Sequence, residues 1–271
     1  MKEMALKNIL ITGDCHGQVS NRLHKIHNTM PEYRPEETAI IILGDVGLNY
    51  YLNKRDHNHK KEVSSYGYTI YCVHGNHEAR PREEMGMKLI SDDFVGGTVW
   101  MEDEFPLIRY FCDWGFYNIQ GRRTLVLGGA YSVDKFYRLQ NGWQWFEDEQ
   151  LTTVDMRTCM FNMKEFGHEF DLVLSHTCPY DWRPTDLFLN FIDQSKVDTT
   201  MEVWMDGVRT DIPWGIWLFG HYHADRIERP HVEMFYYEVE DLNAIEERWK
   251  KYDETGELDW WLPKSPNFYM K

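Results

Sequence analysis

The stretch YTIYCVHGNHE, residues 68–78, joins a run of β-branched and aromatic residues to a turn of polar side chains. A short run that is apolar at nearly every position is typical of a strand buried on both faces of a sheet. Gly75 and Asn76 suit the turn because both tolerate left-handed backbone angles. Turn formation does not explain His77, so the stretch predicts a buried strand whose end carries a functional side chain.

Further runs of the same kind lie at residues 8–12, 38–43, 124–129, 171–175 and 216–220. Polar segments of helical length separate the first three strands, at residues 18–30 and 50–65. Strands that alternate with helices favour βαβ units and a parallel sheet. Residues 97–129 hold strand-like runs without intervening helices, and we expect them to form a second, more antiparallel sheet.

The later part of the chain is predicted to hold a helix over 147–166, a strand over 233–239 and a helix over 240–251. No Pro/Gly/Ser-rich linker interrupts the pattern, so we predict one domain over residues 1–271. Within it we expect a helical insertion at about 181–213 and an aromatic C-terminal extension at about 252–271.

Composition limits the partners of the chain, which has 271 residues, a net charge of −15 and five cysteines. An acidic chain repels the nucleic-acid backbone, which makes nucleic acid an unexpected partner. The cysteines are odd in number and form no CxxC pair, so we expect free thiols. No apolar run reaches the roughly 20 residues that cross a bilayer, and the first ten residues hold no apolar stretch of signal-peptide length. We expect a cytoplasmic protein without a membrane partner.

Five of the apolar runs are followed by carboxylate, amide and imidazole groups: Asp14, His16, Asp45, Asn76, His77, His176, His221 and His223. Loops at the carboxyl ends of sheet strands are where α/β proteins place their sites. The spacing of 31 residues from position 14 to 45, and again from 45 to 76, matches one βαβ step. Mixed oxygen and imidazole ligands suit Mn²⁺, Fe or Zn²⁺ and suit Ca²⁺ poorly.

In order along the chain, these blocks read GD-x-HG, GD, GNHE, a strand-terminal His and GH-x-H, and they span residues 13–223. This series resembles the calcineurin-like metallophosphoesterases. The resemblance implies an α/β fold, a four-layer α/β/β/α sandwich of two mixed sheets with the metals at one edge. It also implies a site for two divalent ions, Mn²⁺ in the first place, with Fe or Zn²⁺ as alternatives.

Carried over residue by residue, the resemblance assigns seven ligands to two ions. The first ion would be held by Asp14, His16 and His223, the second by Asn76, His176 and His221, and Asp45 would bridge both. His77 would face the scissile phosphate, as an acid toward the leaving group or as a charge stabiliser. Two ions roughly 3.5–4 Å apart can share a water and ionise it to a hydroxide that attacks phosphorus. We therefore expect hydrolysis of a phosphomonoester or small phosphodiester by a metal-bridging hydroxide.

The chain departs from the family pattern at GDVGLN, residues 44–49. This block lacks the second Asp that is common there and the Asp-Arg-Gly of Ser/Thr protein phosphatases. Arg80, three residues beyond His77, could replace the missing substrate arginine. The segment GGAYSVDKFYR, residues 128–138, offers Tyr131, Lys135 and Arg138, which could contact substrate or pack the loop. Of these we select Tyr131 as a substrate-binding candidate.

Three other functions remain open. A Ser/Thr-type phosphoprotein phosphatase is favoured by GNHE and disfavoured by the missing arginine motif. A nuclease is disfavoured by the net charge and by the lack of a basic stripe. A non-catalytic interaction scaffold on the same fold predicts lost ligands, and the blocks have lost none. A small phosphorylated substrate fits best, while the natural substrate, the native metal and the oligomeric state stay open.

Overall fold

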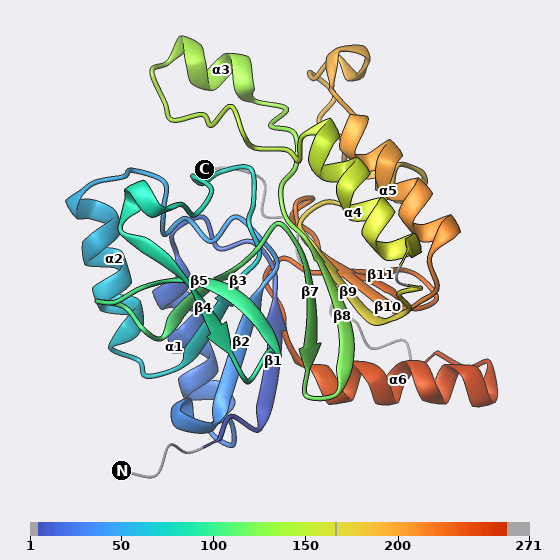
Figure 1. Cartoon of the computed structure of the whole chain (residues 1–271), viewed down its shortest axis with the longest axis horizontal. Coiled ribbons are helices and arrows are strands. Elements are labelled where there is room, and N and C mark those ends of the chain that lie inside the picture. The colour runs from blue at the N-terminus through green and yellow to red at the C-terminus, as the bar shows by residue number, and fades with distance from the viewer. Residues whose placement is uncertain (1–4, 166, 259–271) are drawn as a thin grey trace.

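The computed structural model describes residues 5–165 and 167–258, which form two mixed β-sheets packed face to face (Figure 1). The first sheet has the order β13-β1-β2-β3-β6-β5-β4. Its strands are β1 (Asn8–Thr12), β2 (Thr38–Ile42), β3 (Thr69–Cys72), β4 (Met87–Asp92), β5 (Gly97–Glu102), β6 (Ile108–Phe111) and β13 (Val239–Asp241).

The second sheet has the order β11-β12-β10-β9-β8-β7. Its strands are β7 (Trp114–Ile119), β8 (Arg122–Leu127), β9 (Phe170–Ser175), β10 (Trp214–Phe219), β11 (Arg226–Arg229) and β12 (Val232–Met234). Strands β1, β2 and β3 run parallel in the first sheet, as do β8, β9 and β10 in the second. Both sheets therefore place the ends of several consecutive strands at one edge.

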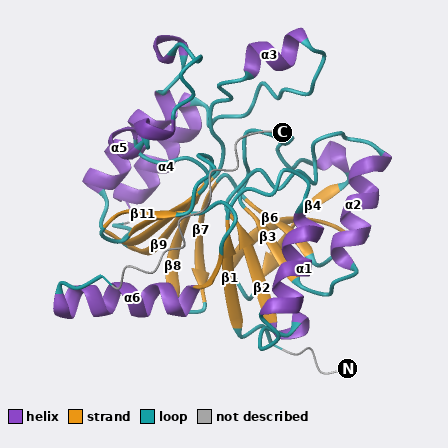
Figure 2. Ribbon diagram, turned by 180° about the vertical axis from the view of Figure 1, so that it is seen from behind, coloured by secondary structure: helices purple, strands orange, loops and turns teal. Residues whose placement is uncertain are grey.

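Helices cover the outer face of each sheet, as Figure 2 shows from behind. Helices α1 (Val19–Thr29) and α2 (Lys54–Ser64) cover the first sheet, and α4 (Thr153–Glu165) and α5 (Thr200–Asp211) cover the second. The short helix α3 (Lys135–Gln140) projects from the body, and α6 (Leu242–Thr255) lies along its opposite end (Figure 1). The predicted four-layer sandwich of two mixed sheets is confirmed.

The continuous apolar runs are explained by burial on both faces of the strands. Along β1, Ile9 and Ile11 are buried between the two sheets, whereas Leu10 is buried beneath the outer helices. Along β10, Leu218 faces the first sheet and Trp217 packs under α4 and α5. An amphipathic alternation would appear only if one face met water.

Three expected elements differ from the observed ones. Within 97–129, β5 and β6 extend the first sheet because β6 pairs in parallel with β3, and only β7 and β8 join the second. The expected strand 233–239 is two short strands, β12 and β13, in different sheets. Helix α4 begins at Thr153 rather than 147, because the Asp155 N–H bonds to the Thr152 hydroxyl and the Thr152 N–H to the Asp155 carboxylate, each at 3.1 Å.

The predicted insertion, 181–213, is only partly helical. Three 3₁₀ turns, η3 (Tyr180–Trp182), η4 (Thr185–Leu187) and η5 (Gln194–Lys196), precede α5, and two others, η1 (Pro35–Glu37) and η2 (Glu83–Met85), lie earlier in the chain. Of the predicted C-terminal extension, α6 takes residues to Thr255, and residues from 259 on lie outside the described part. That the whole chain is one domain stays a prediction. No helix in the described ranges is long and apolar enough to span a membrane.

Candidate functional site

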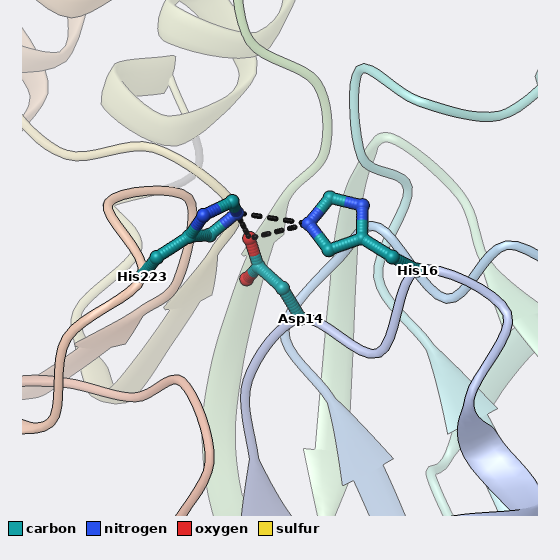
Figure 3. Close-up of side chains that lie close together, drawn as sticks. All are labelled: Asp14, His16 and His223. Atoms are coloured by element: carbon teal, nitrogen blue, oxygen red, sulfur yellow. Dashed lines mark hydrogen bonds and ion pairs between the residues drawn. The ribbon is translucent and has the colours of Figure 1, made fainter. Parts of the chain in front are cut away.

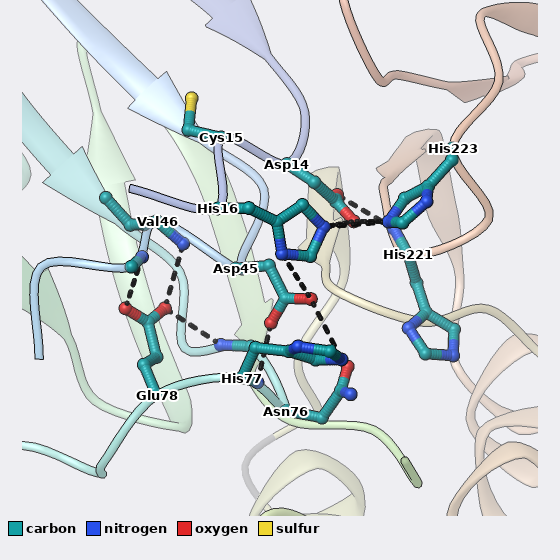
Figure 4. Close-up of polar contacts among 12 residues, drawn as sticks. Asp14, Cys15, His16, Asp45, Val46, Asn76, His77, Glu78, His221 and His223 are labelled. Carbon is teal, nitrogen blue, oxygen red and sulfur yellow. Dashed lines mark hydrogen bonds and ion pairs between the residues drawn. The ribbon is translucent and has the colours of Figure 1, made fainter. Parts of the chain in front are cut away.

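The loops after five strands meet at one edge of the sandwich, three from the first sheet and two from the second (Figure 4). They bring together the eight predicted side chains, Asp14, His16, Asp45, Asn76, His77, His176, His221 and His223. Two glycines, Gly44 and Gly220, leave room for these side chains to lie close to the backbone of neighbouring loops. A Cβ on Gly44 would lie 2.1 Å from Nδ1 of His176, and one on Gly220 would lie 2.4 Å from Oδ1 of Asp14.

Asp14, His16 and His223 form the first cluster (Figure 3). Oδ1 of Asp14 accepts the backbone N–H of His221 at 2.9 Å. Its Oδ2 is buried without a hydrogen-bond partner and lies 3.3 Å from Nε2 of His223 and 3.9 Å from Nε2 of His16. The two imidazole Nε2 atoms are 2.8 Å apart. Two imidazole nitrogens and a carboxylate oxygen without a hydrogen bond thus converge on one point, as the ligands of a cation do.

His176, Asn76 and Asp45 form the second cluster, with His221 beside it. Nδ1 of His176 donates to the carbonyl of Leu43 at 2.8 Å, which directs Nε2 toward Oδ1 of Asn76 at 2.9 Å. The amide of Asn76 cannot turn freely because its Nδ2 donates to the hydroxyl of Ser132 at 2.9 Å. The His221 ring lies edge-on to that of His176, with centroids 5.0 Å apart. Such outer contacts hold metal-ligating groups in place.

Asp45 lies between the two clusters. Its Oδ1 is 3.5 Å from Nε2 of His176, and its Oδ2 is 3.8 Å from Nδ1 of His16. Oδ1 also accepts the backbone N–H of His77 at 2.8 Å. One carboxylate therefore faces both groups of imidazoles, the position that a bridging ligand needs.

The electrostatics of these groups fit a cation site. Burial raises the pKa of Asp14 and Asp45, but neighbouring histidines outweigh it and hold both pKa values below the ordinary one. Burial lowers the pKa of His176, yet the charges of Asp45 and Asp14 raise it to about 9. Without an ion, a proton on His176 offsets the charge of the two buried carboxylates. The donor set, its burial and the absence of a hydrogen bond to Oδ2 of Asp14 therefore fit divalent metal ions.

His77 lies at the rim of this group, with its Nε2 at 4.0 Å from Oδ2 of Asp45. Burial and the charge of Arg138 lower its pKa to about 4, although the charge of Asp45 opposes them. Nη2 of Arg138 contacts Nδ1 of His77 closely and lies 3.2 Å from Nε2. Distances alone also permit a cluster of His16, Asp45 and His77. A guanidinium against the ring makes His77 a poor ligand for a second cation.

The backbone around the site is strained. Positive φ angles occur at His16 (45°), Asp45 (46°), His221 (71°) and His223 (53°), four of the seven non-glycine cases in the described chain. This left-handed conformation costs an L-residue roughly 1–2 kcal/mol. Its concentration here indicates that the surrounding structure holds these side chains in directions that an ordinary turn would not give.

Glu78, which sequence reasoning did not select, holds two of the loops together. Its buried carboxylate accepts the backbone N–H groups of Val46 at 3.2 Å, Gly47 at 3.1 Å and Gly75 at 3.3 Å (Figure 4). It therefore ties the loop that carries Asp45 to the one that carries Asn76. The sequence feature that could have identified Glu78 is its place as the last residue of the GNHE block.

The two predicted substrate-binding residues lie outside these clusters. Arg80 faces Asp113, with Nη1 3.3 Å from Oδ2, and its side chain is mostly buried. Tyr131 is half-buried next to Ser132, and burial together with Glu149 raises the pKa of its phenol. Their roles in substrate binding stay predictions. Arg138, named with Tyr131 but not selected, is the residue of this segment that contacts His77.

Comparison with known proteins gives one family. The profile of the calcineurin-like phosphoesterases matches residues 7–225. No curated protein matches the chain. Two solved structures are similar to this chain. TT1561 of Thermus thermophilus is 14% identical, with a TM-score of 0.46, and the match covers 87% of this chain and 98% of that one. The phosphopantetheinyl hydrolase of Mycobacterium tuberculosis is 13% identical, with a TM-score of 0.41, and the match covers 98% of both chains. Neither is close enough to carry a functional argument.

Proposed function

Because the chain belongs to the calcineurin-like phosphoesterase family, whose members hydrolyse phosphoric esters, we propose that it acts on a phosphomonoester or small phosphodiester. The observation that carries this proposal is the convergence of two buried carboxylates, four imidazoles and an amide at one edge. We assign Asp14, His16 and His223 to one divalent ion, Asn76, His176 and His221 to another, and Asp45 to both. When bound, such ions supply Lewis-acid charge and lower the pKa of water.

The other groups act around these ligands. His77 stands at the rim, where its ring can donate a hydrogen bond to the leaving group of an ester. The contacts of His176 with Leu43 and of Asn76 with Ser132 keep ligand atoms pointed inward. Because the groups are held by strand ends on two packed sheets, little rearrangement is needed when substrate binds.

The substrate we propose is small or carries a terminal phosphate. A net charge of −15 opposes long nucleic acids, so attraction of an anion must be local to the site. Mn²⁺ is the ion we propose first, with Fe and Zn²⁺ as alternatives for the same ligands. A phosphoprotein substrate is the second candidate, since GNHE is the form of this block in Ser/Thr phosphatases.

The test compares p-nitrophenyl phosphate with its bis ester and a phosphopeptide, each with and without Mn²⁺. We expect turnover that depends on added metal and about two ions per chain by elemental analysis after purification without chelator. Mutation of Asp45 to Asn is the matched negative control. Metal-independent turnover, or no Mn²⁺ binding on titration, would overturn the proposal.

A further inference from the structure

The segment of residues 131–149, which we name the α3 arm, supplies none of the proposed metal ligands. It leaves the end of β8 and projects beyond the sheets with α3 (Figure 1). Two contacts tie it to the GNHE turn. Ser132 accepts a hydrogen bond from Asn76, and Arg138 contacts the ring of His77. The arm therefore reaches the two neighbouring side chains to which different roles were assigned.

Arg138 is buried, with 6% of its surface exposed, and every nitrogen of its guanidinium has a partner. Nε donates to Oδ2 of Asp134 at 2.8 Å. Nη1 donates to the carbonyl of Gln144 at 3.0 Å and to the hydroxyl of Tyr50 at 3.5 Å. Nη2 faces the ring of His77. A guanidinium so fully engaged is a fixed part of the site rather than a free cation that waits for substrate.

The contact with Arg138 determines which ring nitrogen of His77 carries the proton. A guanidinium donates hydrogen bonds and accepts none, so Nδ1, the ring nitrogen nearer to Nη2, must be the acceptor. The ring proton of His77 is then on Nε2, which lies 4.0 Å from Oδ2 of Asp45 and so faces the proposed metal ligands. The carboxylate of Asp134 is also 4.0 Å from Nε2, too far for a hydrogen bond that would compete.

We propose that Arg138 is the positioning residue of His77, fixing the ring so that its Nε2–H donates to the leaving group of the substrate. This inference rests on the proposed phosphoesterase function. Arg80 cannot take this part while it is paired with Asp113.

The closing experiment is a double-mutant cycle between positions 138 and 77. Arg138→Met, Arg138→Lys, His77→Ala and the double variant Arg138→Met/His77→Ala are assayed with saturating Mn²⁺ on an alkyl phosphate and on p-nitrophenyl phosphate. Arg82→Met is the matched control, since it removes an exposed arginine that pairs with Asp148 of the same arm at 3.5 Å without contacting His77.

We expect Arg138→Met to lower kcat on the alkyl phosphate by about 10- to 100-fold with little change in KM, the scale of a misplaced hydrogen-bond donor that stabilises the charge of the leaving group. The loss should be smaller on p-nitrophenyl phosphate, whose leaving group needs less help. Arg138→Lys should recover part of the activity, and Arg138→Met should cause no further loss once His77 is alanine. An equal loss in both backgrounds, a rise in KM alone, or loss of bound Mn²⁺ would overturn the proposal.

A second readout does not depend on turnover. In ¹⁵N-labelled protein loaded with diamagnetic Zn²⁺, the ring of His77, assigned by comparison with His77→Ala, should carry its proton on Nε2. In Arg138→Met the proton should be shared with Nδ1. An unchanged spectrum in Arg138→Met would refute the positioning role. If the wild-type protein were inactive on every ester, the proposed function would be wrong. This spectrum would still show whether Arg138 fixes the proton of the His77 ring.

Discussion

Loss of the Glu78 carboxylate should weaken both the fold and the site, by an amount that follows from its three backbone contacts. In Glu78→Ala the N–H groups of Val46, Gly47 and Gly75 lose their acceptor while they stay buried. An unsatisfied buried donor costs about 1–3 kcal/mol. Allowing for partial entry of water, we expect destabilisation of about 3–5 kcal/mol.

Glu78→Gln separates hydrogen bonding from charge. Oε1 accepts from both Val46 and Gly75, so a glutamine oxygen can keep these two bonds. Its amide nitrogen then meets the N–H of Gly47, a donor that needs an acceptor. Burial raises the pKa of Glu78, which shows that the charge itself is costly there, and its removal offsets part of the loss. We expect about 1–2 kcal/mol.

The assay is urea unfolding followed by tryptophan fluorescence, together with Mn²⁺ titration of each variant. Glu84→Gln is the matched control because it removes the same charge from an exposed position nearby, and it should shift stability by less than about 0.5 kcal/mol. Mn²⁺ affinity should fall in the order wild type, Gln and Ala, since Glu78 sets the separation of the loops that carry Asp45 and Asn76. If Glu78→Ala unfolds with the control and binds Mn²⁺ equally well, the reasoning is wrong.

Three further outcomes are expected. Asn76→Ala should weaken binding of one of two ions, and excess Mn²⁺ should restore part of the activity; full activity without added metal would remove Asn76 from the ligand set. Burial raises the pKa of Glu202 to about 7. The protonated carboxyl therefore stabilises the fold fully below its ordinary pKa of 4.5, and this stabilisation is lost as pH rises through 7. The free energy of unfolding of the wild type should therefore fall between pH 5 and 8, and Glu202→Gln should remove up to about 3 kcal/mol of that fall, measured by urea unfolding at each pH. An unchanged pH profile in Glu202→Gln would contradict the raised pKa of Glu202. Long duplex DNA should not be cut efficiently, and cleavage with steep salt dependence would contradict the proposed substrate class.

The fold was predictable where the sequence pattern is local. Continuous apolar runs such as residues 8–12 and 38–43 became strands buried on both faces, and the polar residues after them share one edge. Which of the two sheets a strand joins could not be predicted from the local sequence pattern. Whether β5 and β6 join the first or the second sheet depends on the pairing of Ile70 with Ile108, residues 38 positions apart, which no periodicity reports.

The site was predictable for residues that carry recognisable blocks and unpredictable for those that support them. Arg138 lies in a short helix with several exposed apolar neighbours, among them Phe136 and Leu139, and from the sequence it could either contact substrate or pack the loop. Its role depends on where the α3 arm folds back, which is a tertiary property. The left-handed backbone at His16 and Asp45 was equally hidden, since non-glycine residues rarely adopt it and the fold decides where they do.

The site draws Asp14, Asp45 and Asn76 from one sheet and His176, His221 and His223 from the other. Ions bound there would connect the two halves of the sandwich across their interface, as a removable cross-link does. Unfolding would then have to release them, so stability should rise with the logarithm of free metal concentration, by about 2.7 kcal/mol at 100 times the dissociation constant of one site. Metal supply would thereby set the lifetime of the folded protein as well as its activity, and a chelator should lower the melting temperature of a chain whose own contacts are unchanged.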